Sequence, residues 1–181
     1  MIKASFPPLV DAGTRVLILG SLPGEISLAK GEYYANPQNH LWRLVGAVIG
    51  ADIDSRHTAY ADRLAALTSA HVGLWDVVKT ASRVGSLDTQ IRDHAPNALP
   101  DLAKTLPQLR AIGFNGGTSW KIGSTQFPAD TPLALVALPS SSAAYTIGFE
   151  RKLTEWIKLR AYLEHDDFCR NRQKSESCSQ T

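Results

Sequence analysis

The residues best suited to chemistry gather in one polar and aromatic stretch, residues 33–42, which reads Tyr-Tyr-Ala-Asn-Pro-Gln-Asn-His-Leu-Trp. Tyr34 offers an aromatic face on which a planar ring can stack. Asn39 offers an amide oxygen that can hold a water molecule, acting by position and dipole because an amide has no useful basicity. Asparagine is equally suited to cap a helix that begins near His40. The stretch therefore predicts a reactive site, a well-capped helix start, or both together.

Further polar residues follow short apolar runs elsewhere in the chain. Asp76 ends a Leu-Trp-Asp segment and is either a ligand-reading carboxylate or a structural partner of Lys79 or Arg83. Asn115 precedes two glycines, where it either contacts a ligand or water or completes a strand-to-helix turn. The remaining candidates are Ser21 and Leu22 in a Gly-Ser-Leu-Pro-Gly-Glu turn, Trp75 beside Asp76, and Ser140, Ser141 and Ser142 after a Leu-Pro pair.

The elements that must position these residues follow from hydrophobic patterning. Four apolar runs predict buried strands at residues 16–19, 72–77, 111–114 and 133–138. Helical patterns lie at residues 41–49, 60–67, 99–106, 117–122 and 150–163, and Trp42 is expected in the core. Strands that alternate with helices predict an α/β fold. Because ligand-binding loops follow the carboxyl ends of parallel strands, the candidate residues are expected to meet at one edge of the sheet.

Length and composition limit the classes of protein that need to be considered. The chain has 181 residues, 44% of them hydrophobic and 20% charged, and we expect one domain over residues 1–164 and a polar, disordered tail over residues 165–181. No apolar run is long enough to span a bilayer and no secretory signal is present, so a cytoplasmic location is expected. The only cysteines, Cys169 and Cys178, lie in the tail, and no metal or cofactor is predicted.

The charge distribution is a weak indicator of function. A net charge of +2 does not by itself indicate nucleic-acid binding. Two basic clusters either face a phosphate backbone or form a solvated surface, and charge alone favours the solvated surface. The clusters are Lys79, Arg83 and Arg92, and Arg151, Lys152, Lys158 and Arg160.

The motifs taken together resemble those of a known family. The turn at residues 20–25, the stretch at residues 33–42 and Leu138-Pro139-Ser140 are similar to the signature of the uracil-DNA glycosylase superfamily, and most to its hypoxanthine (deoxyinosine) branch. The resemblance implies a three-layer α/β/α sandwich around a central, mostly parallel four-stranded sheet. It also implies a monofunctional DNA glycosylase of base excision repair, which flips out a deaminated base, hydrolyses its N-glycosidic bond and leaves an abasic site.

The resemblance further implies roles in catalysis. Many superfamily members position the attacking water with an acidic or amide residue in the first loop, but the matching residue here is Leu22. In the hypoxanthine branch the asparagine that matches Asn39 takes this task, and Asn115 is a second catalytic candidate. Tyr34 is expected to be the stacking platform for the flipped base.

The same resemblance implies which residues read the base and contact DNA. Asp76 is expected to accept the N1 hydrogen of hypoxanthine or the N3 hydrogen of uracil as a carboxylate, and to reject adenine, whose N1 is an acceptor. Trp75 and Leu22 complete the expected base-binding set. Phosphate contacts are expected from Ser21 and from the loop of Ser140, Ser141 and Ser142, which lacks the leaving-group histidine of the uracil enzymes.

Other functions remain open from the sequence alone. The expected partner is double- or single-stranded DNA with a deaminated base, bound by a monomer. Uracil or mismatch-specific excision is the nearest alternative, and a catalytically silent binder of damaged DNA is another. A serine hydrolase that uses one of the loop serines is disfavoured because no Gly-x-Ser-x-Gly turn is present.

Overall fold

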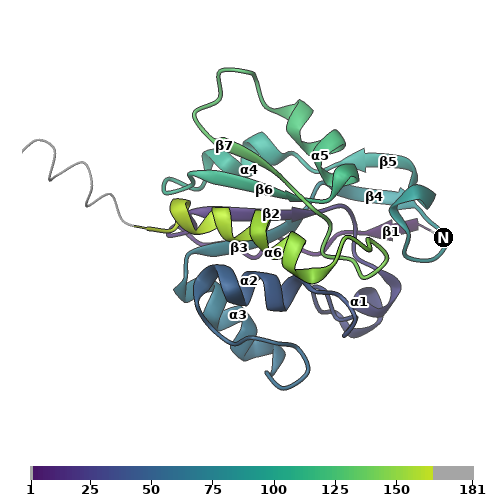
Figure 1. Cartoon of the computed structure of the whole chain (residues 1–181). Helices are drawn as coiled ribbons and strands as arrows, with labels where there is room; N and C mark the ends of the chain where they lie inside the picture. Colours follow the sequence, from purple (N-terminus) through teal and green to yellow (C-terminus); the bar gives the residue numbers. More distant parts are fainter. Residues whose placement is uncertain (1, 165–181) are drawn as a thin grey trace, which may run out of the picture.

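A four-stranded parallel sheet forms the centre of the protein, as the computed structural model of residues 2–164 shows (Figure 1). Its strands stand in the order β3-β2-β6-β7. They are β2 (Val16–Gly20), β3 (Val72–Asp76), β6 (Ala111–Asn115) and β7 (Ala134–Leu138). The central strands β2 and β6 are buried along their whole length, which explains why they read as continuous apolar runs rather than alternating ones. The prediction of a mostly parallel four-stranded sheet is confirmed.

Helices cover both faces of the sheet and complete the predicted three layers. Val16 and Ile18 point into one core cluster and Leu17 and Leu19 into the other, as the alternation of a strand requires. The first face carries α2 (Leu41–Ile49), α3 (Tyr60–Ser69) and α6 (Phe149–Trp156), which continues as the 3-10 helix η3 (Ile157–Tyr162). The second carries α4 (Leu99–Lys104) and α5 (Gly117–Gly123), which ends in the short η2 (Ser124–Gln126).

A small antiparallel sheet on the second face was not predicted. It consists of β1 (Ile2–Ala4), β4 (Val78–Ser82) and β5 (Arg92–Pro96) in the order β1-β4-β5. All five residues of β5 are exposed and one is a proline, so this edge strand has no apolar pattern to reveal it. The short helices α1 (Glu25–Lys30) and η1 (Asp88–Gln90) were also missed. Between β4 and β5 the chain runs past the carboxyl end of β3, where it helps to form the site.

The expected core position of Trp42 is confirmed. Its side chain is 1% exposed, and its ring lies edge-on to Tyr60 with centroids 6.1 Å apart. The Trp42 indole N–H donates to the carbonyl of Tyr34 at 3.2 Å, so a core residue fixes the backbone of a site residue.

Residues 2–164 contain neither a membrane-spanning helix nor a cluster of metal-binding side chains. None of the described helices is long and apolar enough to cross a membrane. Residues 2–164 hold no group of three or more His, Cys, Asp or Glu side chains placed to bind a metal ion. The predicted tail at residues 165–181, with Cys169 and Cys178, lies outside the described residues.

Candidate active site

A cavity of about 410 Å³ opens at the carboxyl ends of the parallel strands. Strand register brings its residues together, because Gly20 pairs with Asp76 and Asn115 pairs with Leu138 in neighbouring strands. The cavity lies where ligand sites of open α/β sheets are expected, and its size is typical of such sites. Of the ten predicted site residues, those on its wall are Ser21, Leu22, Tyr34, Asn39, Asp76, Asn115, Ser140, Ser141 and Ser142.

Tyr34 is held in an unusual conformation on the cavity wall. Its φ of 52° lies in the left-handed region, which a tyrosine adopts only when its surroundings enforce it. The Trp42 indole holds its carbonyl, and its hydroxyl accepts a hydrogen bond from the Asn115 amide at 3.1 Å. The ring is stacked on Tyr33, with an interplanar angle of 27°. Tyr34 therefore presents a fixed aromatic surface to the cavity, as a stacking platform requires.

Gly20 leaves room at the floor of the cavity. A Cβ atom added to it would lie 2.6 Å from the Tyr34 hydroxyl and 2.8 Å from Asp76 Oδ1. Any side chain at this position would displace two groups of the site, so the end of β2 requires glycine.

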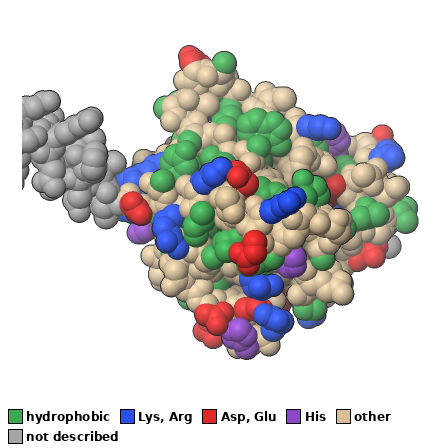
Figure 2. All heavy atoms as spheres, in the orientation of Figure 1, with side chains coloured by type: hydrophobic (Ala, Val, Ile, Leu, Met, Phe, Trp, Pro, Cys, Tyr) green, Lys and Arg blue, Asp and Glu red, His purple; other side chains and the backbone are tan. Residues whose placement is uncertain are grey.

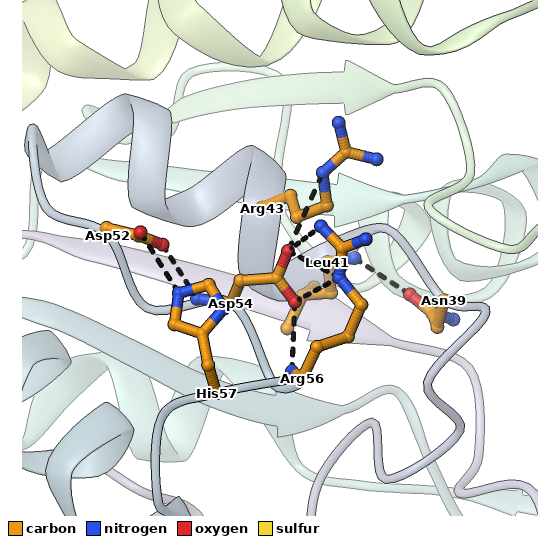
Figure 3. A network of polar contacts seen from close by, with 7 residues as sticks. All are labelled: Asn39, Leu41, Arg43, Asp52, Asp54, Arg56 and His57. Atoms are coloured by element: carbon orange, nitrogen blue, oxygen red, sulfur yellow. Dashed lines mark hydrogen bonds and ion pairs between the residues drawn. The ribbon is translucent and has the colours of Figure 1, made fainter.

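Asn39 lies both at the start of α2 and on the cavity wall. Its Oδ1 accepts the backbone N–H of Leu41, the first residue of α2, at 2.9 Å, and so caps the helix from the position before His40 (Figure 3). The carbonyl oxygen retains a second lone pair, and Asn39 lies on the cavity wall. The next residue is also fixed, because the His40 N–H donates to the carbonyl of Ser141 at 2.9 Å. The cap therefore orients an amide whose free lone pair is available to a ligand or water.

Asn115 ties two loops of the site together. Its Nδ2 donates to the hydroxyls of Tyr34 at 3.1 Å and Ser141 at 2.8 Å, and its Oδ1 accepts the Ser141 N–H at 2.8 Å. Both N–H groups of the amide are therefore engaged within the protein, and the side chain is 7% exposed. This arrangement favours a positioning role for Asn115 over direct contact with a water or base.

Asp76 is the most buried acidic group on the cavity wall, with 3% exposure. Its Oδ2 has no hydrogen-bond partner among the described residues, and neither Lys79 nor Arg83 forms an ion pair with it. Burial, and secondarily the charge of Asp88, raises the pKa of Asp76 to about 8 against the opposing effect of Arg83. The structural alternative predicted for Asp76, a salt bridge with one of these cations, is wrong.

Arg83 holds the first loop from behind. It is 2% exposed, and its guanidinium donates to the carbonyls of Leu22 and Pro23. The same group lies 3.8 Å from Asp88 Oδ1. Such a buried side chain neither contacts a phosphate backbone nor belongs to a solvated surface, so both alternatives for its cluster, including the favoured solvated surface, are wrong at Arg83.

Comparison with known proteins agrees with this geometry. The model of the uracil DNA glycosylase superfamily matches residues 7–164. A hypoxanthine DNA glycosylase of Methanosarcina acetivorans is 41% identical over 157 residues, which are 86% of this chain and 96% of the relative. A hypoxanthine DNA glycosylase of Methanosarcina barkeri is 45% identical over 119 residues, 66% of this chain and 74% of the relative.

The chain belongs to the uracil DNA glycosylase superfamily. A solution NMR structure of a Methanosarcina acetivorans protein has the same fold, with a TM-score of 0.79 and 39% identity. The match covers 91% of this chain and all of the other. The resemblance inferred from the three motifs is thus confirmed over nearly the whole domain, together with the fold that it implied.

Within this superfamily fold, Trp75 does not reach the site. Successive residues of a strand point to opposite faces, so Trp75 lies on the side away from Asp76. It packs against the second core cluster, and its indole N–H donates to the carbonyl of Phe6 at 3.0 Å. Trp75 is absent from the cavity wall, and its assignment to base binding is wrong.

The serine loop of this superfamily member differs in detail from the prediction. Ser141 is fully buried and bound to Asn115, so it supports the loop rather than offering its hydroxyl to DNA. The Ser140 and Ser142 hydroxyls accept N–H groups of their own loop, at 3.2 and 3.3 Å. Ser21 donates to Asp88 Oδ1 at 2.6 Å.

The side chain of Lys152 and the backbone of His40 support the serine loop. Lys152 is fully buried and donates to the Ser142 carbonyl at 2.8 Å, and burial lowers the pKa of its amine. Lys152 is therefore neither an exposed phosphate ligand nor part of a solvated surface, so both alternatives given for its cluster are wrong at this residue. Burial, and then the charges of Lys152 and Arg43, lower the pKa of His40. His40 Nδ1 is buried without a hydrogen-bond partner among the described residues.

Beside Asn39, the start of α2 leads into a polar network outside the cavity (Figure 3). Arg56 binds Asp54 through two nitrogens, and Arg43 lies 3.9 Å from the same carboxylate. The hydrogen bond from Arg56 lowers the pKa of Asp54 to about 2. The network therefore fixes the turn after α2.

The face seen in Figure 2 carries Lys and Arg side chains among Asp and Glu rather than a block of one sign.

One part of the wall was missed by sequence reasoning. Residues 86–89, between β4 and β5, line the cavity together with the serine loop. Ser86 Oγ accepts the N–H of Glu25 at 3.0 Å, and Lys3 donates to the carbonyl of Gly85 at 2.6 Å. These contacts depend on the small sheet that the sequence did not reveal, so no local signal identified Asp88 as a site residue.

Proposed function

We propose that this protein excises hypoxanthine from deoxyinosine in DNA by hydrolysing the N-glycosidic bond, and so acts as a DNA-deoxyinosine glycosylase that leaves an abasic site. Two relatives of 41% and 45% identity are named hypoxanthine DNA glycosylase, which supports the substrate. The observation that carries the reaction is the placement of Asn39. A helix cap fixes its amide on the cavity wall. The described residues that line this wall include no histidine, lysine or arginine.

The cavity is suited to an extruded base. A base stacked in a duplex cannot reach the edge of the sheet, so its nucleotide must rotate out of the helix. The Tyr34 ring and the apolar side chain of Leu22 offer surfaces for the planar ring. Asp76 then faces the hydrogen-bonding edge of the base from the floor of the cavity.

Hydrolysis requires a water molecule held against the sugar. As the C1′–N bond breaks, its electron pair remains with the base and positive charge develops on the deoxyribose. The Asn39 oxygen holds the water by accepting one of its hydrogens, and the water oxygen bonds to C1′. Since the described cavity wall has no lysine, no amine is available for a Schiff base, and the product is an uncleaved strand.

The rest of the interface follows from the same proposal. The loop of residues 140–145 offers backbone N–H groups and hydroxyls to phosphates beside the lesion, with Lys152 behind it. The protein works as a monomer on double- or single-stranded DNA. Because the proposed substrate is genomic DNA, we expect the protein in the cytoplasm, at the nucleoid.

Single-turnover assays on matched duplexes with inosine or uracil test this function. We expect abasic sites at inosine, with strand breaks only after alkali treatment. Strong excision of uracil without excision of hypoxanthine would replace the substrate. Tight binding to inosine DNA without release of the base would show a binder that has lost catalysis.

Asn39→Ala tests the residue on which the reaction rests. We expect the excision rate to fall about 100-fold or more, while DNA affinity changes little. Loss of the cap lowers the free energy of unfolding by only about 1 kcal/mol. Asn39→Asp preserves the cap, and its thermal midpoint should match the wild type. A rate loss in Asn39→Ala no larger than fewfold would leave Asn39 with the cap alone.

A further inference from the structure

Asp76 is a carboxyl group whose surroundings do not compensate a negative charge. It is 3% exposed, and one oxygen has no hydrogen-bond partner among residues 2–164. Arg83, the one cation that acts on its pKa, is turned toward the carbonyls of Leu22 and Pro23 and toward Asp88. A carboxylate that is desolvated without a partner is strongly disfavoured, and such a group takes up a proton instead.

Of the other charged and titratable groups around Asp76, only one favours its ionised form. Tyr33 and Tyr34 interact with it electrostatically, and burial raises the pKa of both phenols, so both are neutral at physiological pH. Asp88, from η1, adds negative charge and opposes ionisation of Asp76. Only Arg83 favours the ionised form, and its effect is the smallest of the three causes. The cavity floor therefore holds an acid in its neutral form near pH 7.

The reaction needs a hydrogen-bond donor at this end of the cavity. Negative charge from the broken glycosidic bond spreads over the departing purine and onto its carbonyl oxygen. The serine loop lacks a histidine, and the described cavity wall has no histidine, lysine or arginine to meet this charge. A neutral carboxyl has one O–H donor and one acceptor oxygen side by side.

We propose that Asp76 acts as a neutral carboxylic acid that donates its O–H to the carbonyl oxygen of the flipped base and accepts the adjacent ring N–H. This proposal rests on the proposed function and changes the expected role of Asp76, because a carboxylate would only accept. The hydrogen bond strengthens as charge develops, and the proton stays on Asp76. The water supplies its oxygen to C1′ and, in balance, one proton to the departing base.

The neutral acid has a consequence for selectivity. It matches the N1–H and carbonyl edge of hypoxanthine, but it can also pair with the N1 and amino group of adenine. Charge repulsion by Asp76 therefore does not exclude adenine. Exclusion rests instead on the cost of extruding a base from a stable pair, which is least for a mismatched or damaged base.

The pH dependence of the single-turnover rate at saturating enzyme tests the proposal. Between about pH 6 and about pH 10 the wild-type rate should fall roughly tenfold per pH unit once Asp76 ionises. Asp76→Asn keeps a neutral donor and acceptor, so it should retain the rate at pH 7 within about tenfold and lose the alkaline fall. Asp76→Ala should lose about 100-fold or more at every pH.

A second variant identifies the titrating group. Asp88→Asn removes a charge that raises the pKa of Asp76, so the alkaline fall should move to lower pH. A midpoint that does not move in this direction assigns the fall to another group and overturns the proposal. Thermal melting and the affinity for abasic DNA, measured for each variant, separate misfolding from loss of catalysis.

The opposite pH dependence would overturn the proposal. A wild-type rate that rises through the same pH range, with Asp76→Asn as inactive as Asp76→Ala, would show that the carboxylate is the active form. Failure of the proposed function looks different, because the wild type would then release no hypoxanthine at any pH.

Discussion

Where β3 and residues 86–89 reach the cavity, its wall carries two carboxyl groups, Asp76 and Asp88, whereas the loop at residues 140–145 is held by the buried amine of Lys152 and by the backbone N–H of His40. The first side has hydrogen-bonding groups without a free cation, and the second has one cation, Lys152, without a carboxylate partner. Burial shifts the pKa of Asp76 upward and those of Lys152 and His40 downward, so it weakens charge of either sign.

This difference matches the two halves of a nucleotide. A base is neutral and offers hydrogen-bond donors and acceptors at its edge, while its phosphates are anionic and need positive potential. The acidic side is thus suited to the base and the cationic side to the backbone. The base supplies hydrogen-bonding partners to the acidic side, and the phosphates supply negative charge to the cationic side. Substitutions on the two sides should therefore have separable effects.

Closing the acidic side should have the largest effect. Gly20→Ala places a methyl group within 3 Å of both the Tyr34 hydroxyl and Asp76 Oδ1, so the base can no longer reach its partners. We expect the single-turnover rate to fall about 100-fold or more, with smaller changes in the affinity for undamaged DNA. Gly117→Ala is the comparison on the same cavity wall, because a Cβ there meets no heavy atom within 4 Å and so displaces neither Tyr34 nor Asp76. Equal losses in both variants would refute a specific requirement at Gly20.

Neutralising the cationic side should weaken binding while leaving chemistry nearly intact. Lys152→Met keeps the length of the side chain and removes the charge behind the serine loop. We expect a several-fold weaker Kd for abasic DNA because positive potential behind the loop is lost, and a salt-dependence slope reduced by less than one because the buried amine contacts no phosphate directly. The thermal midpoint should stay or rise, since a buried ammonium without a carboxylate partner is removed.

Lys158→Met provides the comparison for this variant. Lys158 is exposed and paired at 2.7 Å with Glu155, three residues before it, so its loss should change neither the Kd nor the salt slope. If Lys152→Met lowered the excision rate as strongly as it weakened binding, the separation between the two sides of the cavity would fail.

The sequence predicted the acidic and cationic sides unequally. Strand runs and the turn signals after them located Asp76 and Asn115, because parallel strands bring their carboxyl ends together whatever their order. The sequence also indicated the stretch before α2, which holds Tyr34 and in which Asn39 is both a helix cap and a residue of the cavity wall. These features depend on local patterns that apolar periodicity and turn chemistry carry.

Features that depend on long-range packing were not predictable in this way. Asp88 reaches the cavity through an exposed edge strand and a small sheet without apolar alternation. Arg83 and Lys152 have the composition of surface residues, yet the loop carbonyls that they bind lie 60 and 10 positions away in the chain. No pattern within one segment distinguishes such buried cations from solvated ones.

A substitution at Trp75, beside the acidic side of the cavity, should have the smallest effect on the excision rate. Trp75 and Asp76 are neighbours in β3, but only Asp76 faces the cavity, while the Trp75 indole donates to Phe6. Trp75→Phe removes this bond and some packing, so the free energy of unfolding should fall by about 1–2 kcal/mol. The excision rate at a temperature well below the melting transition should stay within about twofold of wild type, because no group on the cavity wall is removed. Denaturant titration and single-turnover kinetics on the same preparation check both values. A large rate loss in a stably folded Trp75→Phe protein would extend the base-binding wall to the other face of the strand, contrary to the alternation that separates these two residues.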